Sequence, residues 1–261
     1  MAFGLLRVAR VLERASRGLA AATFTRAELD DLAVREWEDF GKRGPIVGDE
    51  TFSWEDEFFR NHIRPGDSIL VAGAGTGRDV IPLLEAGHEV VALDITPQAL
   101  EVLAERARKG GFRVVTMKVS IAEASLPPRA YDVILFSWFC FGYLRGAEDR
   151  GRALARSEAA LRPGGRILIS YPTRRDTDPS SAPPSGLARR AARLLGGVEP
   201  ERGDQFVVSG TAREPAVFFS HAFTPEEVEA DADRAGLAVV FHAQPTGGTG
   251  VAALMRKGEA K

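Results

Sequence analysis

The stretch VAGAGTGRD, residues 71–79, is the starting point for interpreting the chain. Three glycines alternate with other residues in it, at Gly73, Gly75 and Gly77. An apolar run, DSILVA (67–72), precedes the stretch, and a helical pattern, RDVIPLLEAG (78–87), follows it. A buried strand, a glycine turn and a helix in that order let the backbone turn tightly against a ligand or against the next helix.

Strand and helix patterns alternate along the chain around this turn. Apolar runs predict seven strands, at 67–72, 88–94, 112–119, 131–138, 166–171, 237–243 and 251–257. Such alternation with helices is typical of a mostly parallel sheet covered on both faces. The loop QPTGGTG (244–250) is too short for a crossover helix, so the last two strands should pair antiparallel. The predicted fold is α/β: a three-layer Rossmann-like sandwich with a mostly parallel seven-stranded sheet and an antiparallel last strand.

Two regions fall outside this alternation. Residues 1–65 have helical patterns and are predicted as an N-terminal helical cap. Residues 66–261 are predicted as the main domain, interrupted by an insertion at 172–220 that begins with turn-forming residues. The insertion contains a short basic amphipathic helix, LARRAARLL (187–195), and a candidate hairpin at 204–221. We expect the insertion to act as a lid or a substrate-binding segment.

Composition narrows the classes of function. The formal net charge is −2, so the chain lacks the strong basic field typical of nucleic-acid binding, and no nucleic-acid partner is expected. Cys140 is the one cysteine, which excludes an intrachain disulfide and a cysteine-based metal cluster. No continuous apolar run reaches the ~18 residues of a membrane span. We therefore expect a cytoplasmic protein, and no metal site is predicted.

The first 22 residues form a basic amphipathic pattern. Arginines interrupt the apolar positions too early for a secretory signal. A helix packed over the domain or at a subunit contact is the favoured interpretation, and a homodimer is left open. Peripheral contact of residues 1–22 with an anionic membrane and a transit peptide are the alternatives.

The spacing of the glycines discriminates between possible ligands. A dinucleotide fingerprint has the pattern G-x-G-x-x-G, and Arg78 stands where its third glycine would be. Asp94 ends the second predicted strand, where a carboxylate can accept hydrogen bonds from both hydroxyls of a ribose. This chemistry is shared by NAD and by S-adenosylmethionine. Asp94 therefore indicates a nucleoside without saying which one.

Four blocks in order carry a family resemblance: ILVAGAGTGRD (69–79), VVALDIT (90–96), YDVILFSW (131–138) and LRPGGRILISY (161–171). Together they resemble the successive motifs of class I S-adenosylmethionine-dependent methyltransferases. The resemblance implies S-adenosylmethionine as cofactor. It places Gly73, Ala74, Gly75 and Gly77 against the methionine and ribose portions, Asp94 on the ribose diol, Ile95 beside the adenine, Ser120 and Ile121 at the adenine edge, and Ser137 and Trp138 on the methyl side.

Two positions depart from the family pattern. Val71 stands where an acidic residue usually helps to hold the ammonium group of the cofactor. Ser120 stands where the family often has an aspartate, and its hydroxyl can still accept one hydrogen bond. Asp79 is the candidate to replace the missing acid. Its alternative role is to complement the dipole of the helix that it begins.

The resemblance implies methyl transfer by in-line displacement, which needs alignment of the reacting atoms and no obligatory metal. We expect a small-molecule acceptor that is methylated on oxygen or nitrogen. The catalytic candidates are Tyr143 in the aromatic segment SWFCFGY (137–143), Tyr171 near a possible substrate anion, and His221 as a base. A non-catalytic or regulatory S-adenosylmethionine-binding protein is the alternative that Val71 favours. An NAD(P)-dependent oxidoreductase is a further alternative, which the missing glycine at Arg78 disfavours.

Overall fold

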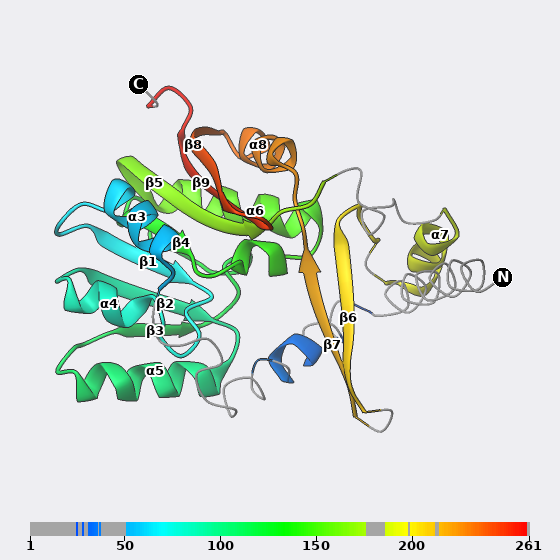
Figure 1. Cartoon of the computed structure of the whole chain (residues 1–261), viewed down its shortest axis with the longest axis horizontal. Coiled ribbons are helices and arrows are strands. Elements are labelled where there is room, and N and C mark those ends of the chain that lie inside the picture. The colour runs from blue at the N-terminus through cyan, green and yellow to red at the C-terminus, as the bar shows by residue number, and fades with distance from the viewer. Residues whose placement is uncertain are drawn as a thin grey trace. The chain divides into compact units, whose positions relative to one another are not determined.

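The structure is a computed structural model of the chain. It describes residues 51–175, 186–197, 199–211 and 214–259, together with 25, 28, 31–35 and 37. The predictions for residues 1–22 lie outside these described residues. The chain divides into two compact units (Figure 1). One comprises Met1–Glu36 and Arg174–Ala222, and the other comprises Trp37–Thr173 and Phe223–Lys261.

The larger unit contains a seven-stranded sheet with the order β3-β2-β1-β4-β5-β9-β8. The strands are β1 (Ser68–Ala72), β2 (Glu89–Asp94), β3 (Val115–Lys118), β4 (Tyr131–Phe136), β5 (Leu161–Pro172), β8 (Leu237–Thr246) and β9 (Thr249–Arg256). Strands β1 to β5 pair in parallel, whereas β9 is antiparallel to both of its neighbours, β5 and β8. The predicted fold class, including the antiparallel last strand, is confirmed.

Helices cover both faces of this sheet. The helices of this unit are α3 (Ser53–His62), α4 (Val80–Glu85), α5 (Pro97–Lys109), α6 (Gly146–Ala160) and α8 (Pro225–Arg234), with a 3-10 helix η1 (Cys140–Tyr143). Helix α8 begins after Thr224, whose N–H donates to the Glu227 carboxylate (3.0 Å) as in a capping box. Helix α3 belongs to the same unit as the sheet, although the sequence places it in a separate N-terminal cap.

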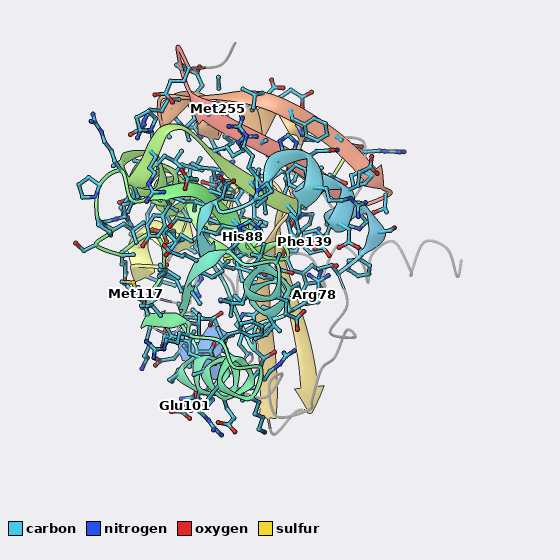
Figure 2. The ribbon with its side chains drawn as sticks, turned by 90° about the vertical axis from the view of Figure 1, so that its left-hand side faces the viewer. Arg78, His88, Glu101, Met117, Phe139 and Met255 are labelled. Atoms are coloured by element: carbon cyan, nitrogen blue, oxygen red, sulfur yellow. The ribbon has the colours of Figure 1, made fainter. Side chains whose placement is uncertain are left out.

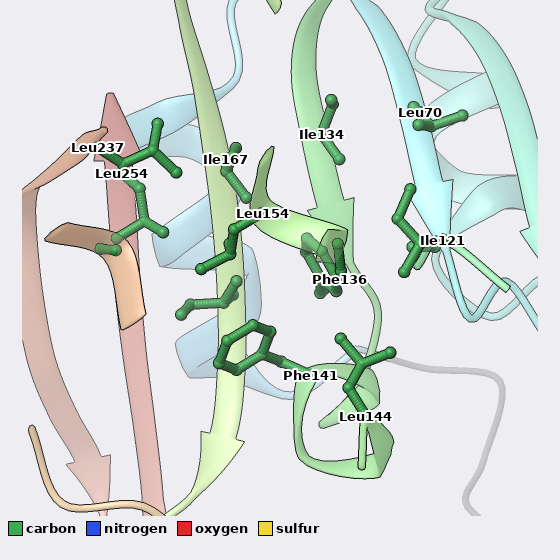
Figure 3. Close-up of a cluster of buried hydrophobic side chains, with 14 of the residues drawn as sticks. Leu70, Ile121, Ile134, Phe136, Phe141, Leu144, Leu154, Ile167, Leu237 and Leu254 are labelled. Carbon is green, nitrogen blue, oxygen red and sulfur yellow. The ribbon is translucent and has the colours of Figure 1, made fainter. Parts of the chain in front are cut away.

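Alternate side chains of the strands form two separate cores. On one face, Leu70 and Ile134 pack with α6, α8 and η1 in the cluster shown in Figure 3. On the other face, Ile69 and Val133 pack with α3, α4 and α5. Neighbouring residues of a strand point to opposite faces, so a sheet that is buried on both sides needs continuous apolar strands. The three-layer arrangement follows directly from these runs.

The smaller unit contains α7 (Gly186–Leu195) and a two-stranded antiparallel sheet of β6 (Asp204–Thr211) and β7 (Glu214–His221). The predicted basic helix and the predicted hairpin are therefore both present. The unit includes residues 174–222, whereas the sequence predicts an insertion at 172–220. Among the residues that the structure describes, no helix is long and apolar enough to cross a membrane.

Candidate functional site: a glycine cradle at the carboxyl edge of the sheet

The glycine loop lies where the strand order reverses. Strand β1 pairs with β2 on one side and with β4 on the other, and all three are parallel. Their carboxyl ends therefore meet at one edge of the sheet, which is where open α/β sheets bind ligands. The loop after β1 (residues 73–79) begins at this edge, and Asp94 and Ser137 stand at the ends of β2 and β4.

The three glycines adopt a conformation that other residues rarely take. The φ angles of Gly73, Gly75 and Gly77 are 72°, 52° and 96°. The Gly73 and Ala74 N–H groups both donate to the Leu93 carbonyl (2.9 Å each), which fixes the loop against β2. A Cβ added at Gly73 would lie 2.6 Å from Cys140 Sγ, so the backbone there is in close contact with the segment after β4.

Gly75 and Gly77 differ in the atoms that an added Cβ would meet. A Cβ added at Gly77 would lie 2.5 Å from Leu103 Cδ1, so Gly77 allows α5 to pack against the loop. A Cβ added at Gly75 would meet no atom within 4 Å. Gly75 is thus not required by protein packing. We define the backbone of residues 73–77 as the glycine cradle, with Gly75 on its open side.

Asp94 joins the end of β2 to this cradle. Its Oδ2 accepts the Gly75 N–H (2.8 Å) and its Oδ1 accepts the Thr96 N–H (2.8 Å). Burial raises the pKa of Asp94, and the hydrogen bonds from Gly75 and Thr96 oppose this rise. A carboxylate offers about four lone-pair positions, and these two bonds use one on each oxygen. Both oxygens can therefore still accept a hydroxyl.

The loop after β3 lies next to the end of β2. The Val119 N–H donates to the Asp94 carbonyl (3.1 Å), which brings the following residues to the same edge. Ser120 is half-buried and its Oγ accepts the Ala122 N–H (3.3 Å), whereas Ile121 is buried in the core. Ile95 follows Asp94 and is half-buried. The structure thus brings together the residues that the resemblance assigned to the ribose and to the adenine.

A buried charge network adjoins the cradle. The sequence indicated Asp79 and Ser137 of this network but not Glu55. Asp79 is 2% exposed, its Oδ2 accepts the Ser137 hydroxyl, and its Oδ1 accepts Arg78 Nη1 (2.9 Å). Arg78 also pairs with the carboxylate of Glu55 from α3, which is itself 2% exposed. Burial raises the pKa of Asp79 to about 6, against the lowering effects of Arg78 and Ser137. The one signal for Glu55 in the sequence was its place near the start of a helix.

Aromatic rings extend the network toward the segment after β4. The Arg78 guanidinium lies over the rings of Phe52 (5.3 Å) and Trp138 (5.8 Å). Trp138 and Phe139 have φ angles of 24° and 63°, which are unusual for non-glycine residues and indicate a constrained turn. The Phe139 N–H donates to Ser170 Oγ (3.1 Å), so this turn is tied to β5. Figure 2 labels Arg78 and Phe139 among the side chains of this unit.

The three catalytic candidates have separate surroundings within their own units. Tyr143 follows Cys140 in η1, and burial, then the nearby Cys140, raises its pKa. Tyr171 is fully buried at the end of β5, and its hydroxyl forms a hydrogen bond with His242 Nε2. His221 belongs to the smaller unit, where its Nδ1 lies 2.7 Å from Asp204 Oδ1.

Two further features of these surroundings bear on chemistry. Burial raises the pKa of the Cys140 thiol to about 12, and the charge of Asp94 adds to this effect, so the thiol is not a nucleophile. In the smaller unit, Glu201, Asp204 and His221 offer ligand atoms within 4.8 Å of one another. This group was not singled out from the sequence, because its three members come from a turn and from the paired ends of β6 and β7.

A mostly parallel sheet with this strand order and a glycine cradle beside a strand-end carboxylate is the arrangement in which open α/β proteins bind nucleosides. Residues 69–165 match the family model described as a methyltransferase domain. The matched domain takes in three of the four sequence blocks and the start of the fourth, so the predicted resemblance to class I S-adenosylmethionine-dependent methyltransferases is confirmed, together with the cofactor that it implies.

Relatives of known name share this part of the chain. A demethylmenaquinone methyltransferase of Tropheryma whipplei is 29% identical over 115 residues, which is 43% of this chain and 46% of the relative. A glycine/sarcosine N-methyltransferase of Halorhodospira halochloris is 31% identical over 145 residues, 54% of this chain and 52% of the relative. The chain thus matches about half the length of these curated relatives.

Solved structures share the fold. The 1,6-didemethyltoxoflavin-N1-methyltransferase of Burkholderia thailandensis, solved with 1,6-didemethyltoxoflavin and S-adenosylhomocysteine, has a TM-score of 0.61. It is 22% identical, and the likeness covers 87% of this chain and 87% of that one. The CcbJ methyltransferase from Streptomyces caelestis has a TM-score of 0.58 and 17% identity, over 77% of this chain and 88% of that one.

Proposed function

We propose that this protein transfers the methyl group of S-adenosylmethionine to a small-molecule acceptor. The observation that carries the proposal is the open side of the glycine cradle. A Cβ added at Gly75 would meet no atom of the described residues within 4 Å, and Gly75 donates its N–H to Asp94. A left-handed glycine that no packing contact requires, hydrogen-bonded to a strand-end carboxylate, is suited to a ligand that lies against the backbone.

The residues at this edge fit the nucleoside part of the cofactor. Asp94 would accept the two ribose hydroxyls, because each of its oxygens keeps acceptor capacity beside its backbone donor. Ile95 offers apolar contact for the adenine and Ser120 offers a hydroxyl at its edge, whereas Ile121 is buried in the core below them in the same loop region. When bound, the cofactor supplies an electrophilic methyl group on a sulfonium.

The methionine part of the cofactor has a different set of neighbours from the family pattern. Val71 is fully buried in the core with α3, α4 and α5, so it offers nothing to an ammonium group. Asp79 is 2% exposed and its charge is already paired with Arg78, while Ser137 also donates to it, so it presents no free carboxylate to an ammonium group. We therefore assign Asp79 to holding Ser137 and the cradle in position. Gly73, Ala74, Gly75 and Gly77 would supply backbone contacts.

On the acceptor side, the described residues of the segment after β4 are mostly aromatic. Ser137 and Trp138 follow the end of β4 there, and Tyr143 lies in η1. The raised pKa of Tyr143 keeps its hydroxyl protonated at neutral pH, so it can donate a hydrogen bond but is a poor base. An amine acceptor needs less help with its proton than a hydroxyl. Two of the reported relatives are N-methyltransferases by name, which supports nitrogen ahead of oxygen.

Calorimetric titration of the full chain with S-adenosylhomocysteine and with NADH tests the cofactor. We expect saturable binding of S-adenosylhomocysteine and none of NADH, and the reverse result would overturn the proposal. Transfer of a labelled methyl group to a panel of small amines, phenols and quinones then tests the reaction. Binding of S-adenosylhomocysteine without transfer to any acceptor would favour the second candidate, a non-catalytic cofactor-binding protein, which the buried Val71 also favours.

A further inference from the structure

Helix α7 (Gly186–Leu195) separates charge from apolar surface along its length. In projection at about 100° per residue, Arg189, Arg190 and Arg193 occupy one arc of roughly 100°. Ala191, Ala192, Leu194 and Leu195 occupy the opposite arc of roughly 160°. The helix sequence GLARRAARLL contains no acidic residue. This is the pattern of an amphipathic helix with a basic polar face.

The apolar arc is only partly used for packing. Ala192 is fully buried, so one edge of the arc faces the protein. Leu194 is 85% exposed and Leu195 is 56% exposed, so the end of the helix presents two neighbouring leucines to solvent. Single exposed leucines are ordinary on protein surfaces. Two adjacent exposed leucines beside three exposed arginines on one helix are a different case, because together they fit a partner that is both apolar and anionic.

The charge of the arginines is only partly neutralised. Arg193 pairs with Glu199 through Nη2 and Oε1 (2.9 Å), and both side chains are exposed. Arg189 also acts on Glu199, and this interaction helps to lower the pKa of that carboxyl. Helix α7 has three arginines and no acidic residue, and among the described residues Glu199 interacts with Arg193 and Arg189, so the helix itself carries a net positive charge beside its exposed leucines. A partner that satisfies both kinds of side chain must have anionic groups at its surface and an apolar layer directly beneath them.

We propose that α7 binds the surface of a membrane that contains anionic lipids. The helix lies in the plane of the interface, Leu194 and Leu195 enter the boundary between headgroups and acyl chains, and Arg189 and Arg190 contact lipid phosphates. A helix of 10 residues is too short to span a bilayer, so the contact is peripheral and reversible. The leucines distinguish this partner from a nucleic acid, which would use the arginines alone.

Flotation of the full chain with vesicles tests the proposal. We expect binding to vesicles of phosphatidylcholine mixed with phosphatidylserine, weaker binding to phosphatidylcholine alone, and loss of binding at high salt. The double variant Arg189→Gln/Arg190→Gln should bind the anionic vesicles about thirtyfold more weakly, from two lost charges. The double variant Leu194→Ser/Leu195→Ser should bind at least roughly tenfold more weakly, because apolar insertion is lost.

Matched controls come from exposed side chains of the larger unit. Val102→Ser/Val115→Ser removes two exposed apolar side chains there, and Arg113→Gln/Arg129→Gln removes two exposed charges. Both should bind vesicles like the wild type. Absence of wild-type binding, or equal losses in the controls, would overturn the proposal. Loss with the arginine variant alone would also overturn it, in favour of a polyanion. Every α7 variant should keep wild-type affinity for S-adenosylhomocysteine, so this test is independent of the proposed reaction.

Discussion

Gly75 and Gly77 lie two residues apart in the cradle, yet an added methyl group should act differently at each. At Gly75, with φ 52° and open space in front, Gly75→Ala costs only the left-handed backbone, about 1 kcal/mol. At Gly77, with φ 96°, the new Cβ would lie 2.5 Å from Leu103 Cδ1 and 3.3 Å from Ile81 Cγ1. Leu103 is fully buried, so relieving this overlap repacks the core at about 1–3 kcal/mol more.

Two measurements separate these effects. For a domain of this size, each 1 kcal/mol lowers Tm by about 2–4 °C, so Gly77→Ala should lose two to four times as much as Gly75→Ala. Affinity for S-adenosylhomocysteine should respond strongly to Gly75→Ala, because its methyl group enters the space that we assign to the cofactor. We expect Gly75→Ala to weaken binding at least about tenfold, or 1.4 kcal/mol, in calorimetric titration.

Gly111→Ala is the matched control for the backbone term. Gly111 has φ 78°, and an added Cβ there would meet no atom within 4 Å. It lies between α5 and β3, away from the carboxyl edge of the sheet. This variant should lose about as much Tm as Gly75→Ala and keep wild-type affinity. Wild-type affinity in Gly75→Ala would refute the cradle, and equal Tm values for Gly75→Ala and Gly77→Ala would refute the packing argument.

Three further predictions concern buried polar groups. Asp94→Asn should weaken S-adenosylhomocysteine binding roughly tenfold to a hundredfold, since it removes a charged acceptor; calorimetry that shows no change would remove Asp94 from the site. Burial holds the folded-state pKa of Asp79 near 6, above its ordinary 3.8, so its contribution to stability is complete below pH 3.8 and is lost as pH rises through 6. Relative to Asp79→Asn, the wild type should lose up to about 3 kcal/mol of unfolding free energy across that window, and denaturant titrations with a constant difference would contradict this. Tyr171→Phe removes the hydrogen bond to His242 and should lower the unfolding free energy by about 1 kcal/mol; an unchanged stability with a collapse of methyl transfer would instead make the hydroxyl catalytic.

The sheet was predictable because its strands are buried on both faces. A continuous apolar run such as 131–138 is expected in a strand that is buried on both faces of a sheet. Alternation of such runs with helices predicts that neighbouring strands pair in parallel. Boundaries were less predictable. Strand β5 begins at Leu161, ahead of the expected Arg166, because Leu161 pairs with Tyr131 across a register shift. Helix α4 begins at Val80 because residues 78–79 belong to the turn that holds the network.

The site was predictable where its signal is local. Glycine spacing and Asp94 lie within one βα unit and its neighbouring strand, so the sequence indicated both. The pairing of Glu55 with Arg78 joins residues 23 positions apart, and nothing near Glu55 distinguishes it from a carboxylate that caps its own helix. The role of His221 as a base stays a prediction, because His221 belongs to the smaller unit and the cradle to the larger one.

Gly73 in the cradle and Cys140 in the segment after β4 are in close contact. The loop that we assign to the cofactor and the loop that we assign to the acceptor therefore cannot change independently. The same two loops are joined again where Ser137 donates to Asp79. A chain that changes its acceptor by substituting residues after β4 therefore also disturbs the turn that we assign to the cofactor. New acceptor specificities in this scaffold should arise with compensating changes at 73–79, and libraries that randomise both loops together should yield more active variants than libraries that randomise either one alone.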